Sequence, residues 1–180
     1  MVKVKIYGDI DNFSKELGRI EKADITLRNK ELIIKFLDYL LANNVGNLRV
    51  IKLGMGLRKI ASWFGKDFDF VTKEDVERVV RNVNINPDYK DWTKSDFKQH
   101  IKQFFKWFKG KNKIFPEEVD WINTKIKLCD NRLVDDILKP QEIFNIVSAC
   151  PFKRDKALIM FLYESGGRVG EVLSMSIKDF

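Results

Sequence analysis

One segment, from Lys94 to Lys109, limits the possible folds more than any other part of the sequence. Its apolar residues recur every three or four positions: Phe97, Ile101, Phe104, Phe105 and Phe108. This spacing places them on one face of a helix and predicts that the face is buried. The preceding Thr93-Lys-Ser-Asp96 is typical of a capping box, so we expect the helix to begin at Lys94.

Helical spacing also dominates the residues before this segment. We expect one helix from about Leu27 to Asn43 and a second one that ends at Gly65, with Val50, Leu53, Leu57, Ile60 and Phe64 on one face. A capping pattern at Thr72-Lys-Glu-Asp75 predicts a third helix through Arg81. Residues 84–91 contain a proline and are expected to form a loop. In residues 2–7 (VKVKIY) apolar and basic residues alternate, which is compatible with either a short strand or an extended arm. The sequence therefore predicts a mainly α fold.

Basic residues are concentrated in the first part of the chain. The net charge is +7, and residues 1–112 hold 23 Lys and Arg against 15 Asp and Glu, whereas residues 113–180 hold 10 against 11. A basic domain suits a polyanionic partner such as nucleic acid.

Two rows of basic residues are the candidate contacts to that partner. They are Lys98, Lys102, Lys106 and Lys109 on the helix after Thr93, and Arg49, Lys52 and Lys59 on the helix before Gly65. Side chains placed in this way would neutralise DNA phosphates without reading the sequence. The alternative is that these rows are solvated helix faces of a protein-interaction module, in which the charge only aids solubility.

Several other classes of protein are disfavoured. The longest apolar run, from Ala157 to Tyr163, has seven residues, far short of the ~20 that a helix needs to cross a bilayer. Residues 1–10 lack the apolar core of a secretory signal, so we expect a cytoplasmic protein without membrane association. Cys129, Cys150 and His100 are far apart and form no metal-ligand pattern, which predicts reduced thiols and no structural metal.

The last forty residues or so differ in character. Pro140 suits the first turn of a helix that we expect to reach Val147. The run from Ala157 to Tyr163 is apolar on all sides and is expected to be buried on all sides. Yet only 42 residues lie between Lys139 and Phe180, fewer than the ~50 of the smallest usual domains. The sequence therefore predicts that this domain is truncated.

Within this region the sequence resembles the tyrosine recombinase (phage integrase) family, which includes the Xer recombinases and archaeal virus integrases. The resemblance lies in residues 138–143 (LKPQEI) and 154–173, above all in Ser165-Gly-Gly-Arg168-Val-Gly-Glu171-Val-Leu173. These residues are similar to the family's Arg-x-x-Glu-Leu motif. Residues 25–110 more loosely resemble its helical, SAM-like core-binding domain. The resemblance implies a core-binding domain in residues 1–112, a linker in 113–138 and the start of the catalytic domain in 139–180.

The resemblance also implies a chemistry. The family cuts duplex DNA by attack of a tyrosine on a phosphodiester, as a tetramer on DNA, and it requires neither a metal nor a nucleotide cofactor. Arg168 matches its first catalytic arginine, whose guanidinium can bind the phosphate oxygens. Glu171 lies on the same helix face and would hold the guanidinium in place. On residue types alone, the pair is an ordinary surface salt bridge.

Other elements of the family pattern have no counterpart in the sequence. His100 is followed by Ile-Lys-Gln and is not the family's His-x-x-Arg box. Tyr7, Tyr39, Tyr89 and Tyr163 all precede the arginine motif, and none matches the nucleophile. We therefore expect the intact parent to be a recombinase and this chain alone not to cleave DNA. The alternative is a non-catalytic DNA-binding protein, either an integrase remnant or a regulator.

Overall fold

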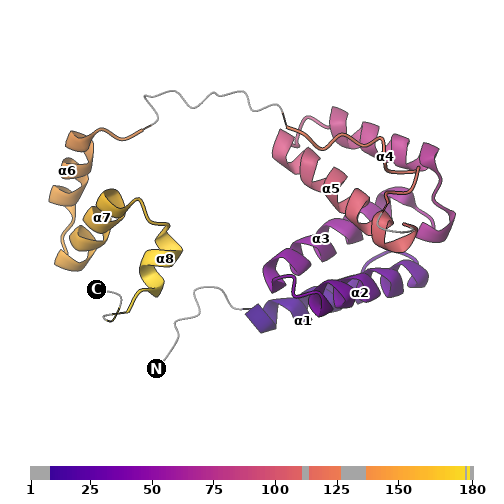
Figure 1. The fold of residues 1–180 in the computed structure, drawn as a ribbon, viewed down its shortest axis with the longest axis horizontal. Coiled ribbons are helices and arrows are strands. Elements are labelled where there is room, and N and C mark those ends of the chain that lie inside the picture. Colours follow the sequence, from indigo (N-terminus) through magenta and orange to yellow (C-terminus); the bar gives the residue numbers. More distant parts are fainter. Residues whose placement is uncertain (1–8, 111–113, 127–136, 177, 179–180) are drawn as a thin grey trace. The chain divides into compact units, whose positions relative to one another are not determined.

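The computed structural model describes residues 9–110, 114–126, 137–176 and 178. Within these residues it contains eight α-helices, one 3-10 helix and no strand (Figure 1), which confirms the predicted mainly α fold. The helices are α1 (Asp9–Glu21), α2 (Leu27–Ala42), α3 (Asn47–Phe64), η1 (Phe68–Phe70), α4 (Lys73–Ile85), α5 (Asp91–Phe108), α6 (Pro140–Ala149), α7 (Lys153–Ser165) and α8 (Val169–Ser174). The chain divides into two compact units, one with α1–α5 and one with α6–α8.

Several helix ends lie where the sequence predicts them. The Thr26 hydroxyl accepts a hydrogen bond from the backbone N–H of Asn29 at 3.2 Å and caps α2. Thr72 and Asp75 form the predicted capping box of α4, which continues to Ile85, four residues beyond the expected end. Gly65 ends α3 with a φ of +65°, a conformation that glycine adopts without steric cost.

The predicted start of α5 is wrong. The helix begins at Asp91, and the N-cap position, Lys90, makes no capping hydrogen bond through its side chain. Asp91 lies in the first turn, where the helix dipole favours a carboxylate. Asp96, the expected capping partner of Thr93, instead forms a 2.6 Å ion pair with Lys52 on α3. A tertiary contact thus replaces the local capping interaction.

The N-terminal part of the chain adds an element that the sequence did not predict. Helix α1 packs on α3, and its Glu16 is fully buried. The two Glu16 oxygens lie 3.4 Å from Arg58 Nε and 3.3 Å from Arg19 Nη1, so both sides of the buried carboxylate face a guanidinium. The VKVKIY segment, Tyr7 and Cys129 lie outside the described residues.

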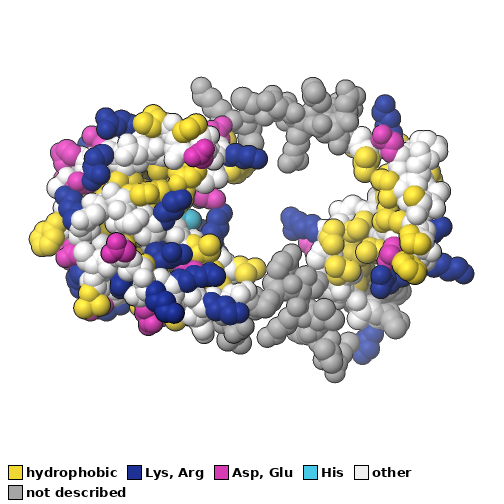
Figure 2. Space-filling model, turned by 180° about the vertical axis from the view of Figure 1, so that it is seen from behind, with side chains coloured by type: hydrophobic (Ala, Val, Ile, Leu, Met, Phe, Trp, Pro, Cys, Tyr) yellow, Lys and Arg dark blue, Asp and Glu magenta, His cyan; other side chains and the backbone are white. Residues whose placement is uncertain are grey.

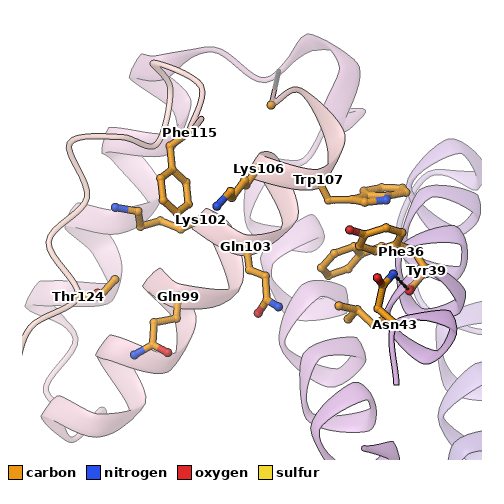
Figure 3. Close-up of a pocket in the computed structure, with 12 residues that line it drawn as sticks. Phe36, Tyr39, Asn43, Gln99, Lys102, Gln103, Lys106, Trp107, Phe115 and Thr124 are labelled. Carbon is orange, nitrogen blue, oxygen red and sulfur yellow. Dashed lines mark hydrogen bonds between the residues drawn. The ribbon is translucent and has the colours of Figure 1, made fainter. Parts of the chain in front are cut away.

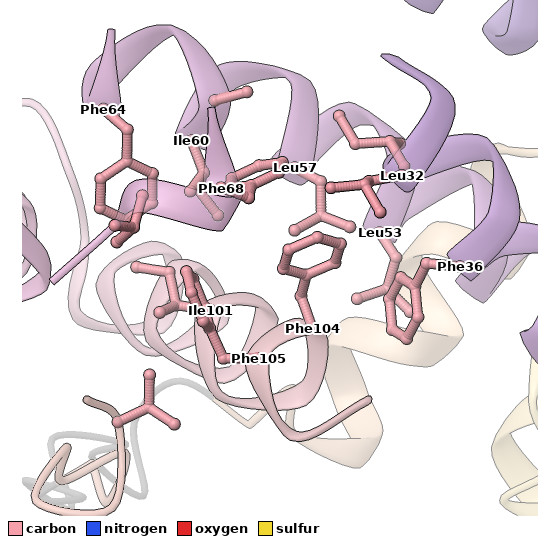
Figure 4. Close-up of a cluster of buried hydrophobic side chains, with 14 of the residues drawn as sticks. Leu32, Phe36, Leu53, Leu57, Ile60, Phe64, Phe68, Ile101, Phe104 and Phe105 are labelled. Carbon is pink, nitrogen blue, oxygen red and sulfur yellow. The ribbon is translucent and has the colours of Figure 1, made fainter. Parts of the chain in front are cut away.

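An aromatic cluster forms the core of the α1–α5 unit (Figure 4). Ile101, Phe104 and Phe105 of α5 are fully buried, as the helical spacing predicts, while Phe97 and Phe108 are half-buried. The Phe104 ring centroid lies 4.5 Å from that of Phe68 and 5.5 Å from that of Phe36. Helices α2, α5 and η1 therefore meet around one side chain.

Residues 114–126, part of the predicted linker, pack against the same unit. Val119 and Ile122 are buried in its core. Lys109 fixes this segment through its ammonium group, which lies 2.9 Å from the Val71 carbonyl oxygen and 3.0 Å from Glu118 Oε1. The division of the chain into a core-binding domain, a linker and a catalytic start remains a prediction.

Helices α3 and α5 cross at a glycine. Gly56 is buried in α3, and a Cβ built on it would overlap the imidazole ring of His100 on α5. The close approach of the two helices therefore requires the absence of a side chain at Gly56. His100 is itself buried, with 8% of its surface exposed.

We expect Gly56→Ala to destabilise the protein by up to about 2 kcal/mol, because overpacking costs roughly 1–3 kcal/mol and the gain in helix propensity returns about 1. Urea unfolding measures the change. Gly18→Ala in α1 is the matched control: a Cβ there has no neighbour within 4 Å, so it should stabilise the protein. Adding His100→Ala should remove part of the Gly56→Ala penalty. Equal stabilisation by both glycine substitutions would refute the close crossing.

The second unit is small and leaves apolar side chains exposed. Ile143 is its only buried apolar residue among those described, and α7 contains no buried residue. The complete burial predicted for residues 157–163 is therefore not observed, because α6 and α8 alone do not cover α7. No helix in the described parts of either unit is long and apolar enough to span a membrane.

Candidate nucleic-acid interface

Helix α3 presents a basic face without acidic residues. It carries Arg49, Lys52, Arg58 and Lys59, and none of its 18 residues is acidic. Arg58 faces the buried Glu16, whereas the other three are exposed. Figure 2 shows Lys and Arg side chains around the single histidine of this unit. Three predicted contact residues are thus brought together on one helix.

Lys52 and Lys59 interact with side chains of α5 or with aromatic rings next to it. The Lys52–Asp96 ion pair is exposed, with 61% and 38% of the two side chains accessible; such pairs contribute only about 0–1 kcal/mol, so Lys52 can exchange its partner for a phosphate at little cost. Lys59 Nζ lies 5.0 to 5.6 Å from the ring centroids of Trp63, Tyr89 and Phe97. These rings hold the charge at a fixed place on the surface.

The lysines of α5 do not form one free row. Lys98 lines a shallow hollow with Lys94 and Lys125. Lys102 Nζ donates to the backbone carbonyl oxygens of Asp120 and Ile122, at 3.3 and 3.0 Å. As described above, Lys109 is held in a similar way. The sequence pattern could not reveal this, because the acceptors lie far away in the sequence, at Val71 and in residues 114–126, a segment without periodicity.

Lys102 and Lys106 border a groove that the sequence did not predict. The groove lies between α2 and α5 and has a volume of about 1000 Å³ (Figure 3). Its lining contains both lysines, several side-chain amides and the rings of Tyr39, Trp107 and Phe115, but no acidic residue among those described. The ammonium groups of Lys102 and Lys106 each lie 4.6 Å from the Phe115 ring centroid.

His100 lies under the basic face of α3 but adds no charge to it at neutral pH. The pKa of His100 is lowered to about 4: burial has the largest effect, the nearby Asp96 raises the pKa, and Lys52 and Arg49 lower it. Its Nδ1 is buried and has no hydrogen-bond partner. The neutral imidazole therefore acts as packing between α3 and α5.

Arg168 and Glu171 are in contact in the second unit. Arg168 is the N-cap residue of α8, and its Nη1 lies 3.3 Å from Glu171 Oε1. The backbone N–H of Arg168 donates to Glu171 Oε2 at 3.1 Å. The Arg168 side chain is 88% exposed, so its remaining N–H groups face solvent. This geometry fits both an arginine held for phosphate binding and an ordinary surface pair.

Each of the three described tyrosines has its own local surroundings. Tyr39 lines the groove, Tyr89 packs on Phe97, and Tyr163 on α7 is 41% exposed. No group of three or more potential metal ligands occurs among the described residues.

Comparison with known proteins shows a short similarity. No family model and no solved structure matches the chain. A stretch of 42 residues is 48% identical to transposase A from transposon Tn554 of Staphylococcus aureus, in strains Mu50 and N315. It covers 23% of this chain and 12% of each relative, so the chain spans only a small part of their length. Part of the chain is thus similar to a protein of DNA recombination.

Proposed function

We propose that this chain is the DNA-binding portion of a site-specific tyrosine recombinase. The observation that carries the proposal is the basic helix α3, which has no acidic residue of its own and exposes Arg49, Lys52 and Lys59. The similarity to a transposase supports a role in DNA recombination, and the Arg168 motif supports the tyrosine class. Double-stranded DNA is the proposed partner.

In this proposal the α1–α5 unit binds the duplex through phosphates. Arg49, Lys52, Lys59 and Lys98 supply charges that can reach DNA, and Lys102, Lys106 and Lys109 raise the positive potential of the unit. Phosphate contacts of this kind orient a domain on DNA and give affinity that falls with salt.

The second unit would contribute to strand cleavage in an intact recombinase. Attack of a tyrosine on the phosphodiester gives a phosphotyrosyl bond and a free 5′-hydroxyl, and negative charge develops on the non-bridging oxygens. Arg168 would bind these oxygens, with Glu171 holding its guanidinium. The described tyrosines are not assigned to the attack, and the parent would act as a tetramer.

A non-catalytic DNA-binding protein is the second candidate. The exposed Arg168–Glu171 pair is compatible with it, because a surface ion pair of this kind needs no ligand. The affinity of Arg168→Ala for duplex DNA that carries a nick separates the two candidate functions. If Arg168 binds phosphate, the substitution should weaken this binding. If Arg168 only forms a surface ion pair, the affinity should not change.

We expect the affinity of the chain for duplex DNA to fall steeply with salt. In Arg49→Ala/Lys52→Ala the slope of log affinity against log salt should be shallower by up to about 1.8, because each lost phosphate contact removes ~0.9. Asp96→Asn removes the acidic partner of Lys52 and should strengthen binding. Fluorescence anisotropy over a salt series measures all three proteins.

The matched control for this double variant is Lys73→Ala/Arg81→Ala. It removes the same charge from exposed positions of a different helix, α4. It should lower affinity much less and leave the slope nearly unchanged. Absence of binding at low salt, or an equal loss of slope in the control, would contradict the proposed interface.

A further inference from the structure

The groove between α2 and α5 differs chemically from the basic face of α3. It is concave and borders the exposed side of Tyr39, which is 48% accessible, together with part of Trp107. Its volume of about 1000 Å³ lies at the upper end of the ~300–1,000 Å³ of small-ligand sites. A duplex cannot place a stacked, paired base in such a hollow, but an unpaired base can enter it.

The charge of the groove selects an anion. Phe115 lies between Lys102 and Lys106 and holds both ammonium groups at one ring (Figure 3). Lys102 is also held by two backbone carbonyls, so this charge is fixed before any ligand binds. With no acidic side chain in the described lining, the two charges lack compensation within the groove. A phosphate group would supply it.

The remaining lining suits a nucleobase. The Tyr39 and Trp107 rings lie 6.2 Å apart, and bases of any type stack on such aromatic side chains. The amides of Gln103 and Asn43 also face the groove (Figure 3) and can bond to base edges. The Asn43 amide nitrogen already donates to the Tyr39 carbonyl oxygen at 2.7 Å, which fixes its orientation.

We propose that this groove is a binding site for an unpaired DNA strand, with a phosphate at Lys102 and Lys106 and a base against Tyr39. The inference rests on the proposed DNA-binding function and extends it to a second DNA conformation. The protein would then have two DNA-binding surfaces: the basic face of α3 binds duplex DNA, and the groove binds a strand that has separated from the duplex.

The test is binding of labelled oligothymidylate of about ten nucleotides by the full chain, beside the duplex of the same strand with oligodeoxyadenylate. Lys106→Ala should weaken single-strand binding and make the salt slope shallower by about 0.7, the value for one contact to a single strand. Tyr39→Leu should weaken it about tenfold without changing the slope, because stacking is lost and charge is not. Arg81→Ala is the control and should change neither quantity.

The duplex arm separates this inference from the proposed function. Tyr39→Leu should not change duplex affinity more than about twofold, and Lys106→Ala should weaken single-strand binding more than duplex binding. Arg49→Ala/Lys52→Ala should weaken duplex binding and leave the effect of Tyr39→Leu intact. Equal losses on duplex and single strand would make the groove part of the duplex surface and overturn the inference. Unchanged single-strand binding in Tyr39→Leu would also overturn the inference. So would displacement of the labelled oligonucleotide by polyglutamate as readily as by unlabelled oligonucleotide, because the ligand of the groove would then be an acidic peptide. Loss of duplex binding alone would overturn the proposed function only.

Discussion

Phe104→Ala is expected to lower the free energy of unfolding by about 3–5 kcal/mol, the usual cost of removing a buried phenylalanine ring. The Phe104 ring is fully buried, and its centroid lies within 6 Å of those of Phe36, Phe68, Phe105, Trp107 and Phe108. Its removal leaves a cavity where α2, α5 and η1 meet. Domains are stable by only about 5–15 kcal/mol in total, so this variant should lie near the limit of folding.

Urea unfolding followed by tryptophan fluorescence measures the loss. Phe70→Ala is the matched control, because the Phe70 side chain is 71% exposed in the same region of the chain, and its loss should cost less than about 0.5 kcal/mol. Phe104→Leu keeps most of the apolar volume and should fall between the two. Similar midpoints for Phe104→Ala and Phe70→Ala would show that Phe104 is not at the centre of the core.

The parts of the fold that local patterns specify were predictable. The start of α2 at Leu27, the Thr72 cap, the stop at Gly65 and the buried face of α5 depend on residues three or four positions apart. Their side chains meet within a single helix turn, so spacing in the sequence is enough to place them. The seven basic candidates were also visible as rows, because charge on an exposed helix face follows the same spacing.

The features that tertiary contacts create were not predictable. Asp96 has a suitable spacing for a cap of Thr93, but it pairs with Lys52, 44 positions earlier. From the sequence alone, Lys102 and Lys109 are indistinguishable from free surface lysines. In the structure their ammonium groups donate hydrogen bonds to the backbone carbonyl oxygens of residues 71, 120 and 122. The groove combines α2, α5 and Phe115, and no local pattern relates these three segments. The DNA contacts themselves remain a prediction for all seven basic residues.

Acidification is expected to destabilise the protein through His100. Burial lowers the pKa of His100 to about 4 in the folded state, against its ordinary 6.5. Between these values the unfolded chain binds a proton that the folded chain does not, so the stabilising effect is complete above pH 6.5 and is lost as the pH falls toward 4. At ~1.4 kcal/mol per pKa unit, the loss amounts to about 3 kcal/mol at pH 4.

Asp75 leaves this window largely undisturbed. The pKa of Asp75 is lowered from 3.8, first by its hydrogen bond to Lys66, so its stabilising effect is lost only below pH 3.8. Urea unfolding at pH 7, 5.5 and 4.5 therefore isolates His100 when wild type is compared with His100→Gln. Stability should fall less in the variant, because glutamine takes up no proton. Parallel pH profiles of wild type and His100→Gln would mean that the imidazole is accessible to water in the folded state. The tight crossing of α3 and α5 at Gly56 would then be wrong as well, because the close contact of the ring with Gly56 is what buries it.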